Sequence, residues 1–86
     1  MKPLTKQAVR DAAEALFTEN GQTTTLEVKN RLRTEGYFAR QQEVSVLMDE
    51  LCQELPWEFM HNGAFRIYRK RQDLDGDILK ILFSDN

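Results

Sequence analysis

The stretch "WEFMHNGAFRIYRKR", residues 57–71, constrains the fold more than any other part of the sequence. Two runs rich in aromatic residues flank an Asn-Gly pair, which is typical of a β-hairpin. A two-residue turn at Asn62 and Gly63 would mix charged and apolar residues on both faces. A three-residue loop, 61–63, gathers the apolar residues on one face, so we predict this loop. The resulting opposite pairs are Phe59 with Phe65, Trp57 with Ile67, and Glu58 with Arg66.

This register predicts the environment of each hairpin side chain. The face made of Trp57, Phe59, Phe65 and Ile67 is expected to close a core, as one face of an antiparallel sheet commonly does. The opposite face places Arg66 beside Glu58 as an ion pair. Tyr68 on that face would either cover the sheet or stack on a nucleic-acid base. The cations without a predicted partner are Arg69, Lys70 and Arg71, at the base of the hairpin.

Helical patterns precede the hairpin. Residues 6–20 have apolar residues at the i, i+3, i+4 spacing of one helical stripe, with Thr5 as N-cap and Gly21 as a stop. Three threonines then favour a short extended segment. In Thr24-x-x-Glu27 we identify a capping box for a second helix near 26–34. Its expected buried residues are Leu26, Val28 and Leu32.

The third helical pattern ends at Pro56. It places Val44, Leu47, Met48, Leu51 and Leu55 on one face. Cys52 lies near the edge of this stripe, and we interpret it as a small buried residue because its acidic neighbours disfavour a reactive thiolate.

The chain of 86 residues has room for one core. We expect a domain over 1–72 and a C-terminal apolar segment over 73–86 that packs on the domain or on a second chain. No apolar run is long enough to cross a membrane, and residues 1–9 lack the apolar core of a signal peptide, so we expect a cytoplasmic location without membrane contact.

The sequence offers little for catalysis or metal binding. One Cys, Cys52, and one His, His61, cannot by themselves build a Cys/His metal site. No nucleophile and base with credible spacing and no glycine-rich phosphate loop are present. We therefore expect no metal, no cofactor and no enzymatic activity. His61 is interpreted as a polar turn residue, with contact to a phosphate as the alternative.

The order helix, short extended segment, helix, turn, helix, β-hairpin resembles the winged helix-turn-helix family over residues 5–71. The matching segments are "TTTLEVKNRLR", "RQQEVSVLMDELCQEL" and "WEFMHNGAFRIYRKR". This resemblance implies an α+β winged helix fold with a three-helix core, a short first strand and a C-terminal hairpin as the wing. It also implies that the third helix enters the DNA major groove while the wing contacts the backbone or minor groove.

The resemblance predicts a DNA-binding transcription regulator that uses the N-terminal half of the third helix and the basic wing. The predicted DNA-binding residues are Arg40, Gln41, Gln42, Ser45, Val46, Arg66, Arg69, Lys70 and Arg71. Charge limits this prediction, because the chain has a net charge of −2 and Asp49 lies in the middle of the outward face of the third helix. Contact along the whole helix is therefore not expected.

The alternative is a winged helix that recognises proteins and binds no DNA. It would use the acidic C-terminal half of the third helix and the apolar C-terminal segment. The segment residues expected to contact a protein partner or a second copy of the chain are Ile78, Leu79, Leu82 and Phe83.

Overall fold

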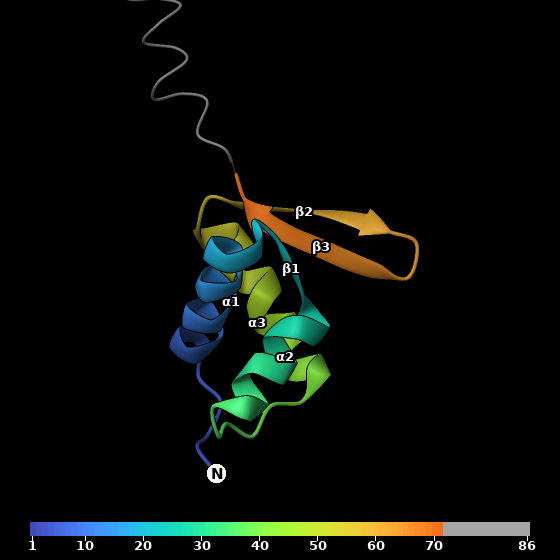
Figure 1. The fold of residues 1–86 in the computed structure, drawn as a ribbon. Helices are drawn as coiled ribbons and strands as arrows, with labels where there is room; N and C mark the ends of the chain where they lie inside the picture. The colour runs from blue at the N-terminus through green and yellow to red at the C-terminus, as the bar shows by residue number, and fades with distance from the viewer. Residues whose placement is uncertain (72–86) are drawn as a thin grey trace, which may run out of the picture.

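In the computed structural model, residues 1–71 are described, so the predicted apolar segment at 73–86 lies outside the described residues. The helices come first and a hairpin comes last (Figure 1). The fold is α+β with a winged-helix-like topology, which confirms the predicted fold class. The elements are α1 (Lys6–Asn20), β1 (Thr23–Thr24), α2 (Thr25–Thr34), α3 (Gln41–Glu54), β2 (Trp57–Asn62) and β3 (Phe65–Lys70).

The ends of α1 and the start of α2 form as their residues predict. The Thr5 hydroxyl accepts the Ala8 N–H at 3.0 Å, and Gly21 ends α1 with a φ of 82°, where a side chain would be strained. At α2 the Thr24 hydroxyl accepts the Glu27 N–H, and the Glu27 carboxylate accepts the Thr24 N–H at 3.1 Å. Thr24 thus ends β1 and caps α2 at once.

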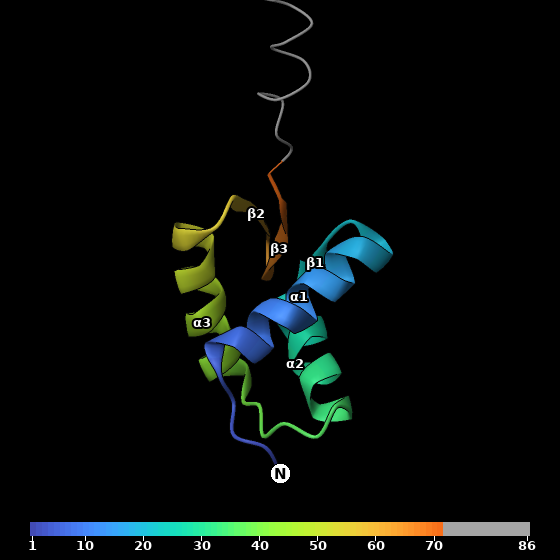
Figure 2. The same cartoon turned by 90° about the vertical axis from the view of Figure 1, so that its left-hand side faces the viewer.

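The core lies where the three helices meet the base of the hairpin. Figure 2 shows α1 crossing in front of α2 and α3, and all three helices contact one another. Phe17 of α1 packs edge-on against Trp57 of β2, with ring centroids 5.0 Å apart. The buried apolar residues are Ala8, Val9, Ala12, Ala13, Leu16, Phe17, Val28, Leu32, Ala39, Val44, Met48, Leu51, Trp57 and Tyr68.

The helix faces were predicted well, apart from one residue of α2. Leu47 and Leu55 pack partly buried against the core, as does Cys52. Leu26, expected in the core, is 48% exposed. It lies in the first turn of α2, where the helix has turned this position toward the hairpin side of the molecule.

The predicted hairpin register is wrong. The strands of the sheet lie in the order β1, β3, β2, and β2 pairs with β3 so that Asn62 faces Phe65 across a two-residue loop, 63–64. Neither the three-residue loop nor an Asn62–Gly63 turn forms. Gly63 instead takes the first loop position with a φ of 67°, which tight two-residue hairpins require.

The new register moves different side chains into the core. Trp57 is buried as predicted, but Phe59 and Phe65 are 42% and 49% exposed, and Ile67 is half-buried. The buried residue of β3 is Tyr68, which is 0% exposed. The reason is visible in Figure 1: the hairpin projects beyond the helices, so only its base has anything to pack against.

The N-terminal residues brace the connection between α2 and α3. Lys2 donates its N–H to the Gly36 carbonyl, and Phe38 donates to the Lys2 carbonyl, both at 2.9 Å. The Lys2 ammonium lies over the Tyr37 ring, 4.5 Å from its centroid. These contacts hold the start of α3 in place. Among residues 1–71, no helix is long and apolar enough to cross a membrane.

Candidate nucleic-acid interface

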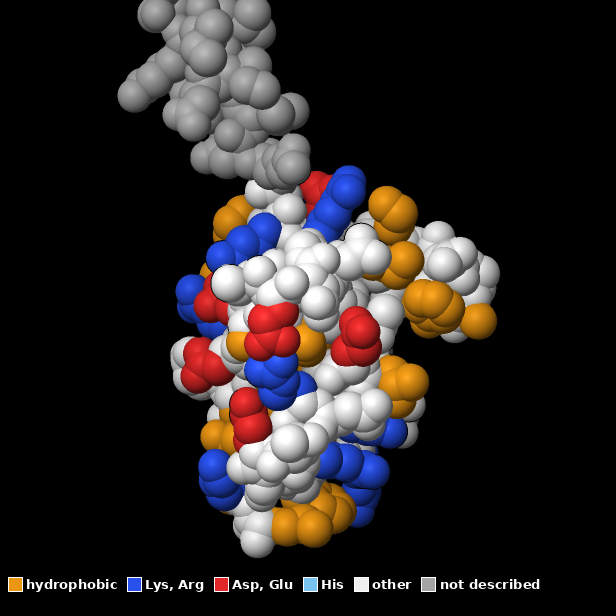
Figure 3. Space-filling view, viewed as in Figure 1, with side chains coloured by type: hydrophobic (Ala, Val, Ile, Leu, Met, Phe, Trp, Pro, Cys, Tyr) orange, Lys and Arg blue, Asp and Glu red, His pale blue; other side chains and the backbone are white. Residues whose placement is uncertain are grey.

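A groove of about 610 Å³ separates the hairpin from the N-terminal ends of α2 and α3. Figure 3 shows the hollow beneath the projecting hairpin. Thr24 to Glu27 form one wall, Gln41 and Ser45 of α3 form the floor, and the hairpin tip forms the other wall. The hairpin residues that line it are His61, Gly63, Ala64, Phe65 and Arg66.

The predicted residues of α3 divide between two sides of the helix. Gln41 and Ser45 line the groove. Gln42 and Val46 instead line a separate shallow hollow, together with neighbours on α3. Only the first pair therefore faces the hairpin.

Arg40 occupies the N-cap position of α3 and is well exposed. Its guanidinium lies 5.2 Å from the centroid of the Phe38 ring and 3.8 Å from the Glu43 carboxylate. Neither contact buries it, because the side chain of Arg40 keeps 69% of its surface exposed. A cation beside a helix N-terminus is suited to phosphate contact.

The side chain of Arg66 lies between the hairpin and α3. The prediction that it pairs with Glu58 is wrong. Its guanidinium forms an ion pair with Asp49 of α3 and lies over the Phe59 ring, 4.4 Å from the centroid. Glu58 cannot reach it, because the observed register places Glu58 opposite Arg69. Asp49, which was expected to repel DNA, is therefore paired with Arg66, which was expected to attract it.

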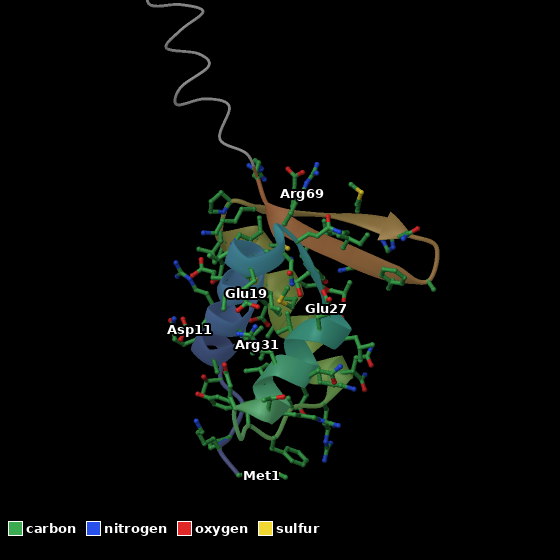
Figure 4. All side chains as sticks on the ribbon, viewed as in Figure 1. Met1, Asp11, Glu19, Glu27, Arg31 and Arg69 are labelled. Atoms are coloured by element: carbon green, nitrogen blue, oxygen red, sulfur yellow. The ribbon has the colours of Figure 1, made fainter. Side chains whose placement is uncertain are left out.

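The basic residues at the end of β3 lie away from the groove. Arg69 donates from Nε to the Glu58 carboxylate at 2.7 Å, so it is not the unpaired cation that was predicted. Figure 4 places Arg69 at the base of the hairpin, pointing away from the helices. Lys70 and Arg71 are exposed and form no ion pair within residues 1–71.

Two cations of α2 have structural partners. Arg31 forms a pair of hydrogen bonds with the Glu19 carboxylate at 2.6 and 2.7 Å, which ties α2 to the end of α1 (Figure 4). Hydrogen bonding from Arg31 lowers the pKa of Glu19. Arg33 donates from Nε to the Ala39 carbonyl at 2.9 Å, just before α3. These two residues brace the helices rather than extend the candidate interface.

Sequence reasoning missed part of the groove. The wall formed by the start of α2 was not predicted, since Leu26 had been placed in the core. No local pattern signals this wall, because it depends on where the hairpin projects. His61, interpreted as a turn residue, is exposed and lies within β2.

The chemistry of the groove favours binding over catalysis. Its polar side chains carry hydroxyl, amide, imidazole and guanidinium groups and one carboxylate, that of Glu27, which accepts the Thr24 N–H in the capping box. Cys52 lies elsewhere, and burial is the main cause of the raised pKa of its thiol. Over residues 1–71, no cluster of three or more His, Cys, Asp or Glu side chains could hold a metal ion.

Three helices followed by a hairpin place this chain structurally in the α+β class, with a winged-helix-like topology. Comparison with models of protein families, with curated proteins and with solved structures found no match to this chain.

Proposed function

We propose that this protein binds double-stranded DNA and acts in transcription regulation, with the N-terminal half of α3 at the major groove and the hairpin as a flanking wing. The observation that supports this most is the groove itself. It brings Gln41 and Ser45 of α3 opposite Arg66 of the hairpin, although these residues are far apart in the sequence. A helix flanked by a projecting hairpin is the arrangement with which winged helices read DNA.

Each residue has a role suited to its chemistry. Arg40 and Gln41, at the positive end of α3, would contact phosphates. Gln42 can bond an adenine edge, Ser45 a base or a phosphate, and Val46 the thymine methyl group. Because these residues occupy two sides of α3, the helix must present its N-terminal end rather than its full length.

The electrostatics favour modest affinity. Lys70 and Arg71 add positive charge at the base of the hairpin, whereas Arg66 and Arg69 are already paired with carboxylates. Few phosphates would be neutralised, and the release of counterions supplies much of the affinity of such proteins. Binding should therefore be strongest at low salt and should weaken as salt rises, with a slope set by the small number of phosphates contacted.

An NMR titration with a short DNA duplex at low salt tests the proposal. We expect amide shifts at residues 40–46 and 61–71, and loss of binding in Arg40→Glu and in Lys70→Glu. Arg10→Glu is the matched control, since Arg10 lies on α1 and pairs with Glu14 at 3.5 Å. No shift at 40–46, or equal losses in all three variants, would contradict a specific site there.

A further inference from the structure

The hairpin exposes more apolar surface than its role as a DNA wing requires. Figure 3 shows hydrophobic side chains gathered over it. Phe59, Met60 and Phe65 are 42%, 48% and 49% exposed. Residues 59–65 carry no formal charge with His61 neutral, and the flanking Glu58 and Arg66 are both in ion pairs. This surface is suited to a protein contact and lacks charge that would repel a second copy.

The outer edge of β2 is open within residues 1–71, since β2 pairs only with β3 in that range. Arg71 donates to the Pro56 carbonyl at 2.7 Å, which marks residues 56 and 71 as a hydrogen-bonded pair. Hydrogen-bonded and non-bonded pairs alternate along an antiparallel ladder. The N–H and C=O groups of Glu58, Met60 and Asn62 therefore point toward β3, and those of Phe59 and His61 point outward.

β2 also lacks the features that usually protect an edge strand. Its residues "WEFMHN" contain neither Lys nor Pro, and its one formal charge, Glu58, is near the base and bound to Arg69. An edge of this kind is a template for another strand.

We propose that two copies of this protein associate by antiparallel pairing of their β2 edges. An edge that pairs with its own copy about a two-fold axis makes a closed dimer. The sheet order leaves β1 on the opposite side of β3, so this pairing does not cover β1. The inference stands independently of DNA binding.

Backbone chemistry favours the register centred on Met60 over the neighbouring one centred on Phe59. With Met60 opposite Met60 of the second copy, each Phe59 pairs with a His61, and all the outward N–H and C=O groups of Phe59 and His61 are satisfied. A register centred on Phe59 would instead require Trp57, whose N–H already bonds the Leu55 carbonyl at 2.7 Å. The selected register also places Glu58 opposite Asn62, so no like charges meet.

Cross-linking tests this register. The full chain with Met60→Cys and Cys52→Ala should form a disulfide-linked dimer on mild oxidation, because non-bonded antiparallel pairs have Cα atoms about 4.5 Å apart. Asn62→Cys with Cys52→Ala is the matched control. Its two cysteines would be four residues out of register, or about 13 Å apart, and should not cross-link. Equal cross-linking of both variants would overturn the register.

Sedimentation equilibrium of the full chain, without DNA, tests the association. The average mass should rise from 10.1 kDa toward twice that value as the concentration increases from about 10 µM to about 1 mM. His61→Pro, which removes an outward N–H, should abolish this rise, whereas His61→Ala should retain it. If His61→Pro dimerises as readily as His61→Ala, the β2 edge is not the interface.

Hydrogen exchange distinguishes the remaining outcomes. In the dimer, the amides of Phe59 and His61 should become protected as concentration rises. A chain that stays monomeric at about 1 mM overturns the proposal. If these amides are protected in that monomer, another part of the same chain occupies the edge; if they exchange freely, nothing does.

Discussion

Arg66 of β3 forms an ion pair with Asp49 of α3, seventeen positions earlier in the chain. This contact joins the hairpin to the helix that would read DNA. It also neutralises the carboxylate that most opposes the approach of a phosphate backbone. Side-chain exposures of 32% for Arg66 and 41% for Asp49 leave the pair accessible to solvent and to a ligand.

Asp49→Asn should strengthen DNA binding and make it more sensitive to salt, because the variant releases Arg66 for a phosphate. Stability should change by less than about 1 kcal/mol, as is usual for exposed ion pairs. Fluorescence anisotropy with a labelled duplex at several salt concentrations measures the effect. Glu50→Gln is the matched control, since Glu50 pairs with Lys6 of α1 at 3.2 Å. An equal gain in both variants would indicate a general charge effect only.

Truncations in the hairpin should follow the observed register. Tyr68→Ala should lower the free energy of unfolding by about 3–5 kcal/mol, as the loss of a buried aromatic ring does. Phe65→Ala should cost less than about 1 kcal/mol, because half of that side chain is already exposed. Urea unfolding measures both. A larger loss for Phe65→Ala than for Tyr68→Ala would contradict the register.

The Tyr68 hydroxyl is buried and forms no hydrogen bond of ordinary geometry within residues 1–71, although it lies near enough to the Arg66 guanidinium to raise the pKa of Arg66. Burial of an unpaired hydroxyl opposes folding. Tyr68→Phe should therefore raise the free energy of unfolding by about 1 kcal/mol. Tyr37→Phe, at a half-buried position, is the control and should change stability less. A destabilised Tyr68→Phe would mean that the hydroxyl has a partner in solution.

The Glu19–Arg31 pair should make the free energy of unfolding decrease at acidic pH. Because Arg31 holds the pKa of Glu19 below its ordinary value, the folded state retains the charged carboxylate at a pH where the unfolded state takes up a proton. The stabilisation is therefore present above about pH 4.3 and lost as pH falls through the lower, folded pKa. Carboxyl NMR titration should show the pKa of Glu19 rising in Arg31→Met. An unchanged pKa would exclude the ion pair as its cause.

The Cys52 thiol should make the free energy of unfolding decrease at alkaline pH. Its pKa is raised, mainly by burial and further by Asp49, so above about pH 8.5 the unfolded thiol ionises while the folded thiol stays neutral. The free energy of unfolding should therefore decrease between pH 7 and a pH above 9 more in the wild type than in Cys52→Ala. Urea unfolding at both pH values measures this, and equal decreases would contradict it.

Local interactions explain why much of the fold was predictable. The Thr5 cap, the Gly21 stop and the Thr24–Glu27 capping box depend on residues a few positions apart, and all form as predicted. The buried stripes of the helices follow from the helical repeat. The groove was less accessible to prediction: the contribution of Gln41 and Ser45 was foreseen, but the wall formed by α2 was not.

The sequence by itself determined the order of the elements, both ends of α1, the capping box that starts α2 and the presence of a hairpin after α3. Only the tertiary structure decided which hairpin residues are buried and which carboxylate pairs with which arginine. A two-fold side-chain alternation is compatible with more than one register, and a shift in pairing changes every cross-strand partner. The choice depends on Tyr68 packing at the base of the hairpin and on Asp49 of α3 lying within reach of Arg66, and both are contacts between distant parts of the chain.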